Sequence, residues 1–111
     1  MRRDPRSYIW DAVRAADLIV EFARGRTLVD YESDALLRSA VERQFVIIGE
    51  ALSQLSRTDA ELAGRVPELG EIIGFRNILV HGYAIVDEEQ VWHTIDDLAA
   101  LRAALRGLVD D

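Results

Sequence analysis

The stretch from Gly74 to Tyr83 is the one segment where an arginine, a histidine and a tyrosine lie close together within an apolar pattern. Read as a helix, at about 100° per residue, it places Arg76 in the middle of a broad apolar face. A guanidinium stays charged, so burying it is costly unless an acidic partner or a cleft receives it. This conflict between residue type and pattern predicts a functional site.

His81 supplies the second chemical group of the stretch. It lies roughly 140° around the helix from Arg76, so the two side chains diverge unless the helix distorts before Gly82 or a second protomer completes the site. Asn77 precedes His81 by one helical turn and is placed to fix the imidazole tautomer. We expect Gly82 to end the helix in a left-handed turn, with His81 at the helix C-terminus, where the dipole favours imidazolium.

The elements that must position these residues are all predicted to be helical. Apolar residues recur at steps of three and four in four long segments, and capping residues precede most of them. The first predicted segments are a helix after the Asp4-Pro5 cap that ends at Gly25, a short turn from Thr27 to Tyr31, and a helix from Ser33 or Asp34 to about Ser56. A short turn after Thr58-Asp59 and the motif helix after Pro67 follow. An extended link over residues 84–86 then leads to a last helix, from a capping box of Asp87 and Gln90 to about Leu108. The fold class is all-α, an up-down bundle of four or five helices.

Gly49 and Glu50 break the pattern of the long helix that precedes the motif. A glycine inside a helix costs about 1 kcal/mol against alanine, so Gly49 indicates the close approach of another helix. Glu50 shares a face with Arg43. Two interpretations stay open: Glu50 belongs to a solvent-facing charged strip, or it is the acidic partner that Arg76 requires.

Length and composition narrow the function. The 111 residues form a single domain, 1–111, and half of them are apolar. The chain has no cysteine, no Gly-rich phosphate loop and no histidine–carboxylate cluster at metal spacing, so we expect no metal and no cofactor. It has no apolar run long enough for a membrane span and no signal-peptide pattern at its start, so we expect a cytoplasmic protein.

The charge is acidic and uneven. All 13 basic residues are arginine, and 20 residues are acidic, which gives a net charge of −7. Residues 1–26 carry six arginines and four acids, a net +2, and the rest of the chain carries seven and sixteen, a net −9. An acidic chain is a poor general binder of nucleic acid, so any contact with RNA must come from a local arginine cluster. The acidic surface also suits a basic protein partner.

The segment R-N-I-L-V-H-G-Y resembles the R-x4-H-x-Y signature of HEPN-domain proteins, specifically the HepT-like toxins that pair with a minimal nucleotidyltransferase antitoxin of the MntA type. Ile48-Gly49-Glu50-Ala51 is similar to the family's I-G-E-A, with Arg43 before it. Tyr8 to Ala12, with Asp11, resembles the opening helix, and Val86 to Trp92 resembles the link into the last helix. The resemblance covers nearly the whole chain, although the last helix lacks the family's Leu-Pro.

The resemblance implies a homodimer in which both Arg-His pairs line one cleft, and metal-independent cleavage of RNA to a 2′,3′-cyclic phosphate and a 5′-OH. His81 would transfer the protons and Arg76 would bind the scissile phosphate and stabilise its growing charge. Asn77 would orient His81, and Glu50 would hold Arg76. The resemblance further implies that the antitoxin transfers AMP to Tyr83 and so silences the nuclease.

Other interpretations remain open at this point. From pattern alone, Tyr83 is a core aromatic residue whose hydroxyl bonds locally. The chain as a whole could also be a non-catalytic module that binds nucleotide or RNA and regulates a nucleotidyltransferase partner, which the net charge of −7 favours. A purely structural bundle would leave the arginine in the apolar stripe unexplained.

Overall fold

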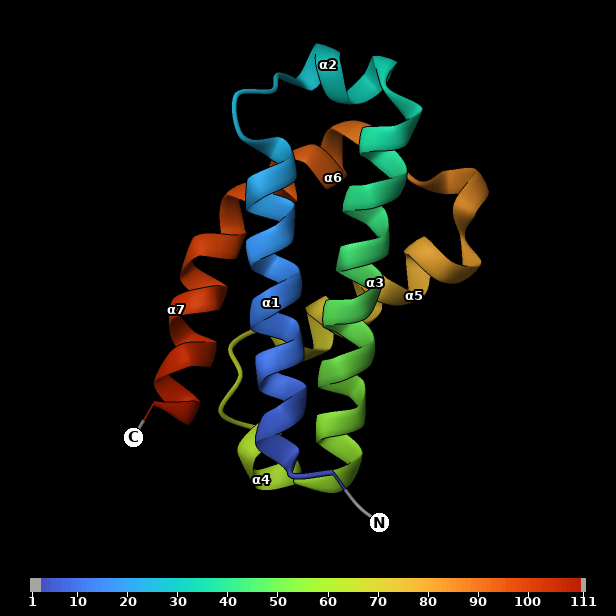
Figure 1. The fold of residues 1–111 in the computed structure, drawn as a ribbon. Helices are drawn as coiled ribbons and strands as arrows, with labels where there is room; N and C mark the ends of the chain where they lie inside the picture. Colours follow the sequence, from blue (N-terminus) through green and yellow to red (C-terminus); the bar gives the residue numbers. More distant parts are fainter. Residues whose placement is uncertain (1–2, 111) are drawn as a thin grey trace.

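All regular structure in the described part of the chain is helical, as the sequence predicts (Figure 1). The computed structural model describes residues 3–110, apart from the side chain of Tyr83. The elements in chain order are α1 (Pro5–Ala23), α2 (Leu28–Ser33), α3 (Ala35–Thr58), α4 (Ala60–Ala63), α5 (Leu69–His81), the 3-10 turn η1 (Tyr83–Ile85), α6 (Glu88–Thr94), the 3-10 turn η2 (Ile95–Asp97) and α7 (Leu98–Val109).

The core lies mainly between α1 and α3, the two longest helices, and is built from the apolar stripes that the sequence shows. Ile9, Val13 and Ile19 of α1 are almost completely buried, as are Val41 and Leu52 of α3. Burying one side chain of this size contributes roughly 1.5–3 kcal/mol. The Asp4 carboxylate accepts from the Arg6 amide at the start of α1, and Gly25, at φ 75°, follows its end as expected.

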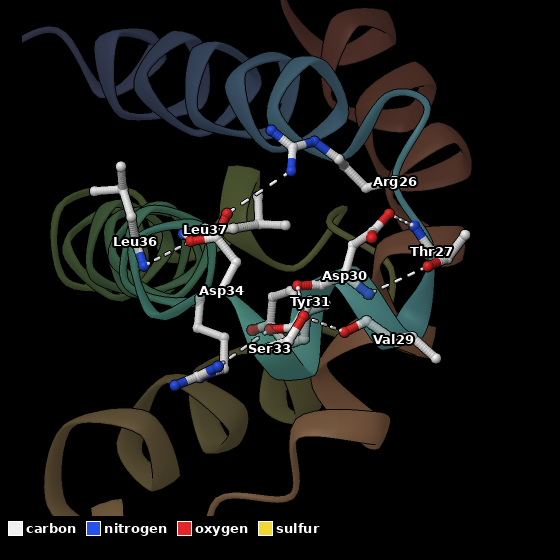
Figure 2. Close-up of polar contacts among 10 residues, drawn as sticks. Arg26, Thr27, Val29, Asp30, Tyr31, Ser33, Asp34, Leu36 and Leu37 are labelled. Carbon is white, nitrogen blue, oxygen red and sulfur yellow. Dashed lines mark hydrogen bonds and ion pairs between the residues drawn. The ribbon is translucent and has the colours of Figure 1, made fainter.

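A network of side-chain caps fixes the turn between α1 and α3 (Figure 2). Thr27 and Asp30 form a reciprocal capping box that starts α2, with bonds of 3.1 and 2.9 Å. Asp34 Oδ1 accepts from the amides of Leu36 and Leu37 at 3.0 and 3.1 Å and so starts α3. These bonds satisfy amides that have no partner within their own helix. The direction in which α3 leaves the turn is therefore encoded locally.

Three long helices, α1, α3 and α7, lie side by side with alternating direction, as an up-down bundle predicts (Figure 1). The fourth, α5, crosses behind α3 and packs mainly on it. The main contacts join α1 to α3, α1 to α7 and α3 to α5, whereas α5 and α7 are not among the closely packed pairs. The bundle is consequently open on the side between α5 and α7.

The prediction of one continuous last helix is wrong, because η2 divides it into α6 and α7. The Thr94 hydroxyl donates to the Gln90 carbonyl at 2.7 Å, a type of bond that bends helices. The bend lets α6 reach α2, where Trp92 stacks against Tyr31 at 5.2 Å between ring centroids. It lets α7 pack along α1, where Arg102 donates to Asp17 at 2.9 Å.

The predicted extended link over residues 84–86 is also corrected. Residues 83–85 form the 3-10 turn η1, and Val86 alone has an extended backbone before Asp87 caps α6. Within residues 3–110, no helix has both the length and the apolar character needed to cross a bilayer.

Candidate functional site

Arg76 does have the acidic partner that its place in the apolar stripe required. Its Nη2 donates to Glu50 Oε2 at 2.8 Å, and its Nη1 donates to Asn77 Oδ1 at 2.9 Å. The Arg76 side chain is 25% exposed, and its Nε is buried without a hydrogen-bond partner. The stem is therefore packed inside the protein, while the end of the guanidinium is fixed at the surface by two oxygens.

Gly49 makes this placement of Arg76 possible. A Cβ atom at Gly49 would lie 2.2 Å from Cβ and 2.6 Å from Cγ of Arg76, closer than real carbon atoms approach. The stem of Arg76 occupies the space that any side chain at position 49 would fill, which confirms the predicted close approach of a second helix. The two residues after Ile48 thus have separate roles: Gly49 leaves space for the stem of Arg76, and Glu50 binds its guanidinium.

Glu50 combines the two interpretations that the sequence left open. It pairs with Arg76 through Oε2, and its Oε1 accepts from Gln54 Nε2 at 3.2 Å, one turn further along α3. Its side chain is still 46% exposed, so the carboxylate lies at the protein surface. Arg43, on the same face of α3, is exposed and has no ion pair within residues 3–110.

His81 lies in the last turn of α5 and is exposed. Among the described residues, no hydrogen bond or ion pair joins His81 to Arg76, and none joins it to Asn77, whose amide oxygen accepts from Arg76 instead. No contact in the described residues therefore supports the predicted orientation of His81 by Asn77. The helix is continuous through His81, so distortion before Gly82 does not bring the arginine and the histidine together.

The backbone at both ends of α5 differs from expectation. Gly82 has φ −109°, so the predicted left-handed turn is wrong. Its lack of a side chain matters for packing: a Cβ there would lie 3.1 Å from the Ile78 carbonyl and 3.2 Å from Ile85 Cγ1. The left-handed residue is Glu68, at φ 58°, which precedes α5 and was not identified from the sequence.

Tyr83 begins the η1 turn, two residues after His81. Its side chain lies outside the described part of the structure, and so does the predicted modification site on its hydroxyl.

α5 is apolar on several sides, although it packs mainly on α3 alone. A helix that is apolar all round is ordinarily buried. Here Leu79 is the buried residue of α5, and large apolar side chains stay in solvent around His81: Ile78 is 45%, Val80 39% and Ile85 75% exposed. Ile78 and Ile85 line the same small pocket, and together they are named here the α5 surface, whereas Val80 lies roughly 160° from Ile78 around the helix.

The described residues contain no group of three or more side chains suited to hold a metal ion. Arg76 and His81 supply two chemical groups of their own. The guanidinium of Arg76 donates hydrogen bonds and carries a fixed positive charge, and the imidazole of His81 has two ring nitrogens that can accept or donate a proton.

Residues 13–108 match the family described as "Ribonuclease HepT-like". A relative from Thermococcus cleftensis, named "Probable ribonuclease HepT", is 31% identical over 109 residues, which cover 97% of this chain and 98% of the relative. Another, from Caldanaerobacter subterraneus subsp. tengcongensis and named "Putative RNase TTE0752", is 32% identical over 93 residues, 84% of this chain and 82% of the relative. No solved structure matches the chain.

Proposed function

Because this chain belongs to the HepT-like ribonuclease family, we propose that it is the toxin of a toxin–antitoxin pair and cleaves RNA with Arg76 and His81. The observation that carries this proposal is the anchored arginine. Position 49 has no side chain, which leaves room for the stem of Arg76, and position 50 has a carboxylate, which binds its guanidinium at the surface of α5.

The proposed reaction uses only these side chains. His81 removes the proton from a ribose 2′-OH, and the 2′-oxygen attacks the adjacent phosphorus. The bond from phosphorus to the 5′-oxygen breaks, and this oxygen takes up a proton, which leaves a 2′,3′-cyclic phosphate and a 5′-OH. Arg76 stabilises the extra negative charge on the phosphate oxygens in the transition state. A guanidinium has five N–H groups, so Arg76 retains donors for phosphate while it is bound to Glu50 and Asn77.

A homodimer is the assembly that we propose for this reaction. Arg76 and His81 diverge by roughly 140° on a continuous helix, so one protomer does not direct both at a single phosphate. Pairing of the α5 surfaces would bury Ile78 and Ile85 and bring the motifs of two chains into one cleft. His81 of one chain could then act as the base and its copy as the acid.

Cleavage of RNA in EDTA tests the proposal. We expect purified protein to cleave a structured RNA without added metal and to leave cyclic phosphate ends. His81→Ala should lower the rate by about 100-fold or more, and Arg76→Ala by a similar factor. The matched controls are His93→Ala and Arg14→Ala, since both residues are exposed and lie on other helices, α6 and α1. Equal rates for wild type and His81→Ala, or complete loss of cleavage in EDTA, would contradict the proposal.

We also propose Tyr83 as the residue to which a partner nucleotidyltransferase transfers AMP. The transfer forms a bond between the tyrosine oxygen and the α-phosphorus of ATP and releases pyrophosphate. The adduct would place a phosphate beside His81, two residues away, and repel the phosphate of RNA. After incubation with the partner and ATP, mass spectrometry should find AMP on Tyr83, absent in Tyr83→Phe and retained in Tyr8→Phe. AMP on another residue would refute the assignment.

The second candidate is a non-catalytic module that binds nucleotide or RNA and regulates the same partner. The observation in its favour is the net charge of −7, which opposes RNA binding over most of the surface. It predicts that RNA or nucleotide binds to wild-type protein and not to Arg76→Ala, and that no RNA is cleaved under any condition.

A further inference from the structure

The open side of the bundle, between α5 and α7, forms a groove with a volume of about 650 Å³. Its floor is apolar. The floor residues come from α3, α5 and α7: Phe45, Ile48, Ile72, Phe75, Leu98 and Leu101. The volume falls within the range of clefts that hold ligands, about 300–1,000 Å³, so the groove has room for several side chains of a partner.

Both rims of this groove are acidic. Glu68 and Glu71 lie on the α5 side, and Asp96 and Asp97 lie on the η2 side. All four are exposed, and none of them takes part in an ion pair within residues 3–110, although most arginines of the described chain do. Asp96 and Asp97 thus line the same groove as Glu68 and Glu71.

We propose that this groove is the docking site for a cationic amphipathic segment of a partner protein, in which apolar side chains seat on the floor and arginine or lysine side chains meet the two rims. Charge complementarity carries this assignment: four unpaired carboxylates flank six apolar side chains. Burial of the apolar side chains supplies affinity, and the paired rims supply orientation and a faster encounter.

A second copy of this chain does not fit the same groove. In a two-fold dimer the same surface meets itself, which would bring the four carboxylates of one copy against those of the other. The rims also repel the phosphates of a nucleic acid.

The proposed catalytic residues do not line the groove, although Arg76 follows Ile72 by one helical turn. Ile72 and Phe75 point into the groove, whereas His81 is exposed outside it. The partner segment should therefore bind whether or not the protein cleaves RNA, and the inference does not depend on the proposed reaction.

The test uses a labelled synthetic helical peptide with leucines on one face and arginines on both flanks. Fluorescence anisotropy measures its affinity, and NMR shifts of the Ile48, Ile72 and Leu98 methyl groups locate it. Glu71→Gln with Asp97→Asn should weaken binding by about tenfold. The matched control is Glu21→Gln with Glu32→Gln, which removes two exposed acids on α1 and α2 and should leave the affinity unchanged.

Three outcomes would overturn the proposal. The first is equal loss of affinity in both double variants, because the peptide would then respond to net charge alone, or NMR shifts at another surface, because the peptide would then bind outside the groove. The second is equal binding of a peptide with serine in place of leucine, or displacement by spermine at equal charge, since the apolar floor would have no role. The third is a change of oligomeric state in Glu71→Gln with Asp97→Asn, which would make a second copy the occupant. Retention of RNA cleavage by this variant separates the result from the test of the nuclease.

Discussion

At the scale of single residues, the site depends on how Arg76 is held. The charge sits in an apolar stripe, and the cost of that position is offset by two oxygen acceptors, on Glu50 and Asn77, at less than 3 Å. The pair is partly exposed, so we expect it to contribute under about 1 kcal/mol to stability. Its larger effect is on the geometry of the guanidinium.

Replacing Glu50 should therefore change catalysis more than stability. We expect Glu50→Ala to lower kcat by roughly 10- to 100-fold, because Arg76 loses its anchor and a small misplacement of a catalytic group is costly. Glu50→Gln, which keeps a hydrogen-bond acceptor, should lie between Glu50→Ala and wild type. Steady-state kinetics with RNA and thermal denaturation measure the two effects. The control is Glu61→Ala, whose exposed carboxylate pairs only with Arg65. Unchanged kcat in Glu50→Ala would show that Arg76 needs no anchor.

Glu42 should give the protein a dependence of stability on pH. Burial and the neighbouring Glu88 raise the pKa of the Glu42 carboxyl above its ordinary value of 4.5. A carboxyl whose pKa is higher in the folded state binds more protons there, so stability should fall as pH rises through and above that value.

Glu42→Gln should remove that part of the slope and raise the free energy of unfolding near neutral pH. Urea denaturation at several pH values from about 4, near the ordinary carboxylate pKa, to about 8 checks the sign of the change in the free energy of unfolding. Glu32→Gln, an exposed acid on α2, is the control. If the stability of Glu42→Gln fell more steeply with rising pH than that of wild type, the Glu42 carboxylate would instead stabilise the fold.

At the scale of elements, α3 and α5 act as one unit. α3 supplies Gly49 and Glu50, and α5 supplies the arginine that fits between them. The T-shaped contact of Phe45 with Phe75, at 5.2 Å between ring centroids, holds the two helices together on the groove side. Access of Arg76 to α3 thus depends on the spacing of the helices as well as on the residues themselves.

Gly49→Ala tests this spacing. Helix propensity alone would make the substitution favourable by about 1 kcal/mol, whereas the contact with Arg76 requires α5 or the arginine to move. We expect a net loss of stability and a loss of RNA cleavage. Gly107→Ala in α7 is the matched control, because a Cβ there meets nothing within 4 Å. It should raise stability by about 0.5–1 kcal/mol. Urea denaturation of both variants gives the comparison, and a stabilised, active Gly49→Ala would show that the site adapts.

At the scale of the whole molecule, two surfaces are left for other chains. The α5 surface is apolar and adjoins the proposed catalytic histidine, while the groove is apolar with acidic rims and lies next to that surface, since Phe75 and Gln90 line both the groove and the pocket at Ile78 and Ile85. Their different chemistry predicts different occupants: a second copy at the first and a basic partner at the second.

Ile78→Asp tests the α5 surface as the dimer interface. A charge in the centre of an apolar interface is left without a partner, so we expect the variant to be a folded monomer with little RNA cleavage. Light scattering after gel filtration gives the mass, and circular dichroism checks the fold. Leu36→Asp is the matched control, since Leu36 is 80% exposed and lies at the start of α3, where an acid is tolerated. A dimeric and active Ile78→Asp would place the interface elsewhere.

Most of the helices and the outline of the site follow from local patterns in the amino-acid sequence. Local rules suffice for this: apolar residues at helical spacing mark the buried faces, and the caps at Asp4, Thr27, Asp34, Asp59 and Asp87 use side chains within three residues of the amides they bind. The need of Arg76 for an acidic partner also followed from the sequence, because a charge within an apolar stripe is costly whatever the fold.

The contacts between residues that are distant in the sequence depend on how the helices pack. Glu50 and Gly49 are 26 and 27 positions from Arg76 in the chain, and no local pattern distinguishes a solvated glutamate from one that an arginine reaches. The break in the last helix arises because α6 and α7 pack on different neighbours, α2 and α1. The acidic groove exists because α5 and α7 do not close the bundle, so that carboxylates from two distant segments line one apolar floor.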